Sequence, residues 1–268
     1  MKIPKGIWLV CALFSLSGCS TKSYVATSNY APNLRRVGDY EISAGAKIRL
    51  TPFLPAPEVN AAFSPLPHIG ILGSYRQDFK SRYPDYKDHN VPTEPYLRQI
   101  LGEIGVGYYH ILKARYGFAL YGGYSAGSIQ RRDDALPLSS KRWASDLNIR
   151  YHRYWLMAYT TLLRGEAQHV EGGFGVKVSR QIFDEYRAVD GFPILDDGVG
   201  QGFNSFEPFL FGRIGKETHQ LHLQAGVAYP QTKAFAEPFY PHLSVQYVFV
   251  SPFKKKKNKA LGESVEHF

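Results

Sequence analysis

Cysteine and long apolar runs are both scarce in this chain of 268 residues. Cys11 lies within the apolar N-terminal stretch and Cys19 follows it, and no other cysteine is present. A disulfide framework or a cysteine-based metal site is therefore not expected. After residue 18 no apolar stretch approaches the roughly twenty residues that a membrane-spanning helix needs. If the chain spans a membrane, we expect a closed β-barrel, in which every strand edge is paired.

The N-terminus has the composition of a secretory signal peptide. Lys2 and Lys5 precede an apolar run over residues 7–16, which is too short to span a bilayer as a helix. The run ends in Leu16-Ser17-Gly18-Cys19, which resembles the lipobox of bacterial lipoproteins. The resemblance implies cleavage after residue 18 and an acyl anchor, such as palmitate, on Cys19. The alternative is an ordinary signal peptide in which Cys19 is incidental.

The residues after Cys19 bear on the destination of the anchor. Ser20 stands at the position where an Asp favours retention in the inner membrane, so we predict the outer membrane. No acidic residue that would mark a surface-exposed lipoprotein follows. We therefore predict a periplasmic N-terminus, with residues 19–37 as a periplasmic linker.

Most of the remaining chain alternates between apolar and polar residues with a period of two, in segments of about ten residues. In residues 40–50, Ile42 and Ile48 share one face while Glu41 and Lys47 share the other. Met is rare, whereas Tyr, Phe and Gly are plentiful, which also favours strands. About ten such segments can be counted. Residues 150–163 and 206–214 are apolar on both faces, so their register stays open.

The links between these segments alternate in length. An up-and-down barrel of the outer membrane has short periplasmic turns, longer outer loops and an even number of strands. We therefore predict an all-β, antiparallel, up-and-down transmembrane β-barrel of about ten strands over residues 38–251, with both termini periplasmic. A soluble β-barrel or sandwich is the alternative, since alternation does not say which face is outside. Aromatic residues near the ends of the apolar face favour the membrane, where they form interfacial girdles. The short links are residues 64–67, 110–114, 164–168 and 215–218, and the long ones are residues 80–97, 128–140 and 183–205.

Three stretches resemble a group of Bacteroidota outer-membrane β-barrel lipoproteins of uncharacterised function. The first runs from Tyr24 to Leu34 and on through Gly38-Asp39-Tyr40-Glu41, and the others are residues 59–71 and 238–249. The resemblance implies the same barrel and brings no activity with it. The chain departs from the group at its end, where residues 252–268 form a basic tail beyond the closing strand.

Charged residues on the polar face would point into a narrow lumen. Barrels near eight strands are just filled by side chains, and isolated buried charges are costly, so opposite charges should pair and plug the barrel. A narrow pore for small solutes is the alternative. The predicted lumen charge network comprises Glu41, Lys47, Arg49, Arg76, Asp78, Glu103, Glu171 and Lys177, with Glu58 and Arg213 as further inward charges.

No constellation of residues points clearly to catalysis. Asp133-Asp134 and Asp196-Asp197 lie in predicted outer loops, where neighbouring side chains point apart. His219 and His222 are three residues apart, so on a strand they face opposite sides. We predict no enzyme, no cofactor and no metal, with a rim-located hydrolase as a further alternative.

The formal net charge is +9, and part of it lies in Lys254, Lys255, Lys256 and Lys257. On the periplasmic side this run is expected to contact anionic headgroups or cell-wall polymer. Outer-membrane lipid is the expected partner of the barrel itself. Export argues against nucleic acid as a partner, and we expect a monomer.

Overall fold

A computed structural model of the chain describes residues 28–50, 53–78, 96–112, 116–134, 144–164, 169–188, 200, 202–216, 218–231 and 240–251. The predicted signal peptide, Cys19 and the basic tail of residues 252–268 lie outside these residues. Among the described residues no helix is long and apolar enough to cross a membrane.

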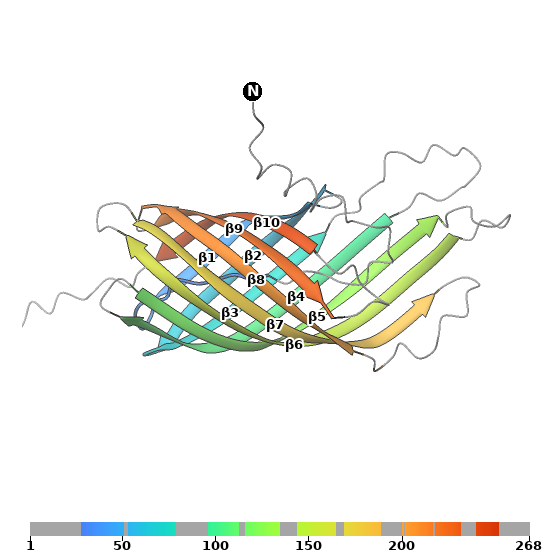
Figure 1. Cartoon of the computed structure of the whole chain (residues 1–268), viewed down its shortest axis with the longest axis horizontal. Coiled ribbons are helices and arrows are strands. Elements are labelled where there is room, and N and C mark those ends of the chain that lie inside the picture. Colours follow the sequence, from blue (N-terminus) through green and yellow to red (C-terminus); the bar gives the residue numbers. More distant parts are fainter. Residues whose placement is uncertain are drawn as a thin grey trace, which may run out of the picture.

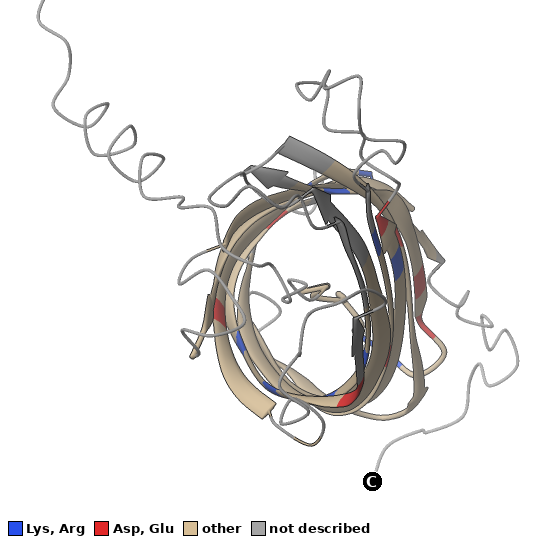
Figure 2. Ribbon diagram, turned by 90° about the vertical axis from the view of Figure 1, so that its right-hand side faces the viewer, with Lys and Arg blue, Asp and Glu red and all other residues tan. Residues whose placement is uncertain are grey.

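Ten strands form one closed barrel, and each strand pairs with its neighbours in the sequence. Every strand pair is antiparallel, and β1 closes the ring against β10 with Tyr40 opposite Ser251. The strands run obliquely to the barrel axis (Figure 1), and the view along that axis shows the closed ring (Figure 2). The strands are β1 (Tyr40–Leu50), β2 (Phe53–Leu66), β3 (Ile69–Asp78), β4 (Tyr96–Leu112), β5 (Tyr116–Asp134), β6 (Ala144–Arg164), β7 (His169–Ala188), β8 (Gly202–Gly215), β9 (His219–Pro230) and β10 (Tyr240–Ser251).

The two ends of the barrel differ in the links that join its strands. At one end, the short-link end, residues 67–68, 113–115, 165–168 and 216–218 join successive strands, and β1 begins and β10 ends there. At the other, the long-link end, the links include residues 79–95, 135–143 and 189–201. Short turns are periplasmic and long loops are extracellular in outer-membrane barrels. The predicted alternation of link lengths is therefore present in the fold.

The outer face of the barrel is apolar and the inner face carries the charges. Ile104 is 61% exposed and Leu210 is 65% exposed, whereas Glu41 and Lys47 are almost wholly buried. A soluble barrel would place its apolar residues inside, so this arrangement identifies the transmembrane kind. Exposed aromatic residues lie near both ends: Tyr108, Tyr116, Phe118 and Tyr247 toward the short-link end, and Tyr75 and Tyr229 toward the long-link end. The predicted fold class is confirmed.

The two segments of open register form β6 and β8. Inside the barrel, β6 buries Trp155, Met157 and Tyr159, while β8 buries Phe209 and Phe211. Both segments look apolar on both faces because their inner faces line an aromatic part of the lumen and their outer faces meet lipid. Pro208 lies inside β8 where the pairing with β9 is interrupted between Phe206 and Phe209. Proline lacks the backbone N–H that the ladder needs, which accounts for the interruption.

Candidate functional site

The lumen of the barrel holds part of the chain that precedes β1. Residues 28–34, which we call the lumen segment, lie inside the ring, and Ser28, Tyr30 and Leu34 are all buried. The sequence predicted a periplasmic linker over residues 19–37, and residues 28–34 of that range are enclosed by the barrel. Residues 35–39 then turn at the short-link end, where the carboxylate of Asp39 accepts hydrogen bonds from the backbone N–H groups of Arg35 and Arg36.

One contact of the lumen segment lies near the short-link end, and we call it the basal contact. Its centre is the ion pair between Arg213 Nη1 and Glu41 Oε1, 2.9 Å apart, in which both side chains are fully buried. The Tyr30 hydroxyl donates to the other oxygen of Glu41 at 2.6 Å, and the backbone N–H of Asn33 donates to Oε1 at 2.9 Å. The amide of Asn33 also donates to Glu171 at 2.6 Å. Three hydrogen bonds therefore tie the segment to wall carboxylates at this level.

Arg213 also holds the main chain of the segment directly. Its Nη2 donates to the carbonyl oxygen of Ala31, and its guanidinium lies 5.8 Å from the ring centroid of Tyr30. A single buried cation thus bridges a wall carboxylate and the segment backbone. Charge-assisted bonds of this kind are about twice as strong as neutral ones.

A second contact lies deeper in the barrel, and we call it the upper contact. Lys177 Nζ lies 3.1 Å from Glu103 Oε1, and both side chains are 2% exposed. Lys177 also donates to the carbonyl oxygen of Ser28 at 2.8 Å, while the N–H of Ser28 donates to Glu103 at 3.1 Å. The Ser28 hydroxyl donates to Glu58 at 2.7 Å. The ring of Trp155 lies 4.4 Å from the same ammonium group, in cation–π range.

Between the two contacts the segment packs against an aromatic cluster. The hydroxyl of Tyr159 donates to the carbonyl oxygen of Pro32 at 2.6 Å, and its ring stacks on that of Tyr121 at a centroid distance of 6.2 Å. The lumen is thus a packed interior with its own apolar core, and not only the charge ladder that the sequence predicted. The cluster consists of Tyr30, Ala31, Leu34, Ala62, Leu72, Tyr109, Ala119, Tyr121, Trp155, Met157, Tyr159, Phe209 and Phe211.

Glycines on the inner face make room for these rings. A Cβ added to Gly107 would lie 2.6 Å from the ring of Tyr121, and one added to Gly173 would meet the ring of Phe211 at a similar distance. Gly107 and Gly173 therefore each leave the space that one aromatic ring occupies.

The predicted lumen charges face inward wherever their side chains are described. Seven of the eight are buried on the inner face, namely Glu41, Lys47, Arg76, Asp78, Glu103, Glu171 and Lys177. The side chain of Arg49 lies outside the described residues. The structure brings together Arg76 and Asp78, 3.0 Å apart, and joins Glu103 to Lys177.

Two inward charges were missed by sequence reasoning. Arg153 and Glu207 are both 0% exposed and lie on β6 and β8, the strands of open register. Cross-strand pairing would have supplied a signal for Glu207, because it lies directly opposite Lys177. Opposite charges facing each other across two strands stabilise the pair, so register and charge could have been assigned together.

The described histidines do not assemble a metal site. His222 is buried inside the barrel, while His219 is exposed and contacts the Tyr247 hydroxyl at 2.6 Å, so the two face opposite sides as predicted. His242 lies inside, within 3.4 Å of the Asn29 amide. Among the described residues, no group of three or more His, Cys, Asp or Glu side chains could hold a metal ion. The side chains of His169, Asp133 and Asp134 are not described, and Asp196-Asp197 falls outside the described chain.

On the described part of the outer face, His152 forms a His–carboxylate pair of the kind that hydrolytic triads contain. His152 Nδ1 lies 2.6 Å from Asp184 Oδ1, and Tyr124 and Tyr154 flank the imidazole ring. In a hydrolytic triad the remaining ring nitrogen would face a hydroxyl or thiol. No nucleophilic side chain of the described chain hydrogen-bonds this ring. Tyr124 and Tyr154 are therefore typical of the aromatic residues on the outer face of such barrels, and the His152–Asp184 pair lies beside them.

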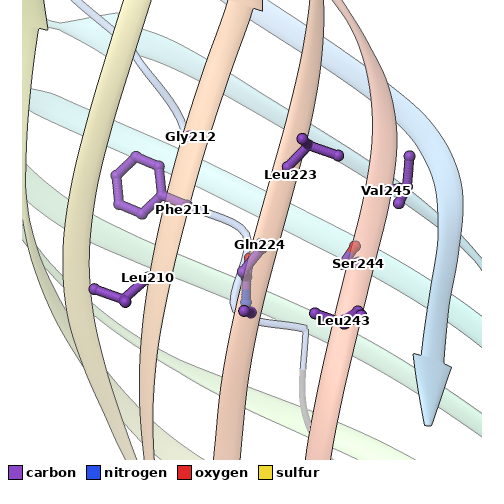
Figure 3. A pocket seen from close by; sticks show the side chains of 9 residues that line it. Leu210, Phe211, Gly212, Leu223, Gln224, Leu243, Ser244 and Val245 are labelled. Atoms are coloured by element: carbon purple, nitrogen blue, oxygen red, sulfur yellow. The ribbon is translucent and has the colours of Figure 1, made fainter. Parts of the chain in front are cut away.

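A shallow apolar hollow lies on the lipid-facing side over β8, β9 and β10 (Figure 3). Leu210, Leu223, Leu243 and Val245 line it, and the small residues Gly212 and Ala225 leave the depression between them. Phe211, Gln224 and Ser244, which alternate with the lining residues, are buried on the inner face. The hollow therefore offers apolar contacts alone, and lipid chains suit it.

No protein-family profile and no curated protein matches this chain. Among solved structures, the chain is similar to the β domain of the Bordetella autotransporter BrkA, with 11% identity and a TM-score of 0.43 over 81% of this chain and 99% of that one. It is also similar to LpxR from Salmonella typhimurium, with 8% identity and a TM-score of 0.37 over 79% and 99% of the two chains. The outer-membrane protein OmpT of Vibrio cholerae, with a loop deleted, gives 7% identity and a TM-score of 0.26 over 79% and 98%. Similarity at these values does not support the transfer of any function. The geometry of the chain itself identifies it as a transmembrane β-barrel.

Proposed function

We propose that this protein is an outer-membrane β-barrel lipoprotein, anchored through Cys19, whose lumen is closed to solutes and whose role is structural or interactive. The observation that carries the proposal is the burial of the inner face around the lumen segment. Arg153, Arg213 and Lys177 are among the largest fully buried side chains of the described chain. Side chains that line a water-filled channel would be exposed to it.

The closed state is also favoured energetically. An ionised side chain in a low-dielectric interior is costly unless it is paired and hydrogen-bonded. At both contacts the charges have partners, and the lumen segment supplies part of the pairing through Tyr30, Asn33 and Ser28. Withdrawing the segment would leave Glu41 and Glu103 with fewer partners. We therefore expect the segment to remain in place as a permanent plug.

Planar-bilayer recordings of the purified full chain test the closed lumen. We expect no steady open-state current in neutral salt across a range of voltages. The alternative, a narrow pore for small solutes, requires such a current, and a reproducible unitary conductance would replace our proposal. A chain lacking residues 28–34 is the matched comparison, because a current gained on deletion assigns the closure to the segment.

Lipidation is tested separately. Mass spectrometry of the purified protein is expected to show a mature chain beginning at Cys19 with attached acyl chains. A Cys19→Ala variant should lose that mass and the incorporation of labelled palmitate. An unmodified mature N-terminus in the native chain would remove the anchor from the proposal while leaving the closed barrel untouched.

The basic run at Lys254, Lys255, Lys256 and Lys257 is proposed to contact anionic headgroups or cell-wall polymer. Substituting all four by Ala in a delipidated form is expected to weaken sedimentation with anionic vesicles but not with neutral ones. Unchanged binding to both would remove this partner. We do not propose the rim-located hydrolase, since His152 has no nucleophile bonded to it among the described residues.

A further inference from the structure

We infer that the chain before Ser28 leaves the barrel through the long-link end, so that the N-terminal region crosses the lumen and Cys19 reaches the outer face. This inference rests on the proposed lipid anchor only for the fate of Cys19. The path of the chain is argued from residues 28–39 alone. It replaces the periplasmic N-terminus that the sequence predicted.

Contacts with strand β7 show in which direction the lumen segment runs. It begins at the short-link end with His169, and Asn33 bonds Glu171, only two residues farther along. Ser28 is bonded by Lys177, which lies six residues beyond Glu171 on the same strand. Six residues of strand correspond to about 20 Å. The segment therefore runs along the barrel, with its lower residue numbers toward the long-link end.

Contacts on other strands give the same direction. Tyr30 bonds Glu41, the second residue of β1, and Arg213, two residues before the end of β8, bonds Ala31. Both positions lie at the short-link end. Ser28 instead contacts Glu58 and Glu103, which lie within β2 and β4, away from their short-link ends. A nearly extended stretch therefore connects the middle of the barrel to its base.

A return of the preceding chain to the short-link end is sterically disfavoured. It would have to pass beside residues 29–34, where Tyr121, Tyr159 and Phe211 pack against the lumen segment. Their side chains are at most 6% exposed, which leaves no space for a second strand of chain. Continuing in the direction already established avoids this packed cluster.

The length of chain is sufficient for the crossing. Nine peptide units join Cys19 to Ser28, and an extended chain of that length spans about 30 Å. From Lys177 to the end of β7 at Ala188 is eleven residues, about 36 Å along the strand. With a strand tilt of 35–45°, the rise along the barrel axis is roughly 28 Å. Cys19 can thus reach the rim, and its acyl chains can enter the outward-facing leaflet.

Single-cysteine reporters on intact cells test this path. Ser23→Cys reports the chain before the lumen segment, Ser140→Cys reports a long link, and Ser264→Cys reports the tail after β10. Each is exposed to a membrane-impermeant maleimide before and after the outer membrane is permeabilised. The unsubstituted chain controls for Cys19, because its labelling would reveal a free thiol and hence a missing anchor. That failure is distinguishable from a wrong path.

We expect the maleimide to label Ser23→Cys and Ser140→Cys on intact cells. Labelling of Ser264→Cys should rise at least tenfold when the outer membrane is permeabilised. Labelling of Ser23→Cys in step with Ser264→Cys overturns the inference. A second measurement is needed because the thiol of Ser23→Cys reacts poorly if it lies against lipid. An epitope inserted after Ser20 should bind antibody on intact cells, and antibody binding confined to permeabilised cells also overturns the inference.

Discussion

The basal and upper contacts of the lumen segment use the same kind of ion pair but hold the segment differently. Arg213 and Glu41 are 2.9 Å apart, Lys177 and Glu103 are 3.1 Å apart, and all four side chains are almost wholly buried. At the basal contact the segment contributes the side chains of Tyr30 and Asn33, together with the Asn33 N–H and the Ala31 carbonyl. At the upper contact Ser28 contributes its backbone N–H and carbonyl as well as its hydroxyl.

The two contacts therefore differ in how far they depend on the side chains of the lumen segment. The basal contact depends partly on which residues the segment carries, because an aromatic hydroxyl and a side-chain amide reach the wall carboxylates beside two backbone bonds. The upper contact depends mainly on the wall, because any non-proline residue offers a backbone N–H and carbonyl. Substitutions that probe the two contacts should therefore have unequal effects, and the cation of each pair should matter more than the segment side chains.

The largest effect is expected for Arg213→Met. This change leaves Glu41 buried without its cation and also removes the donor to the Ala31 carbonyl. Removing one partner of a buried pair costs about 3–5 kcal/mol in free energy of unfolding. Guanidinium unfolding of the detergent-folded barrel, followed by tryptophan fluorescence, measures it. Arg150→Met is the control, since Arg150 pairs with Glu185 with 69% of its side chain exposed and should change little.

A smaller loss is expected for Lys177→Met at the upper contact. Each carboxylate keeps two hydrogen bonds when its cation is removed, but over the whole residue Glu103 is 7% exposed and Glu41 is 0% exposed, so water compensates Glu103 better. The loss of a bond to a charged group costs about 1.5–3 kcal/mol, measured in the same unfolding assay. A loss as large as that of Arg213→Met would show that the two contacts are energetically equivalent and that our comparison is wrong.

Tyr30→Phe and Ser28→Ala form a matched pair within the segment, each removing one hydroxyl. Tyr30→Phe takes a donor from Glu41 and is expected to cost about 2 kcal/mol. Ser28→Ala should cost about 1 kcal/mol, because the Glu58 oxygen that it contacts also accepts from the amides of Asn60 and Gln246. Melting followed by gel mobility without boiling ranks the two variants. The reverse order would place the side-chain specificity at the upper contact.

Alternation was enough to predict the barrel, since residues such as Ile42 beside Glu41 leave one face for lipid and one for the interior. The same reasoning located most inward charges. It failed for β6 and β8, where Tyr159 and Phe211 point inward and remove the contrast between faces. It also failed for the lumen segment, because residues 28–34 have no period and resemble a linker. Their burial arises from wall residues distant in sequence, such as Glu171 and Arg213, which only the closed barrel brings to them.

The pairing of β1 with β10 imposes an order on assembly. This seam joins the first strand to the last, so the ring cannot be sealed until the C-terminal strand has been made. The lumen segment is attached directly ahead of β1 and is enclosed by the completed ring. The proposed acyl anchor on Cys19 would be too bulky to thread through a sealed barrel. On the proposed path of the chain, the sheet would have to close around its leader, and the lumen segment could be withdrawn only after the β1–β10 pairing opened.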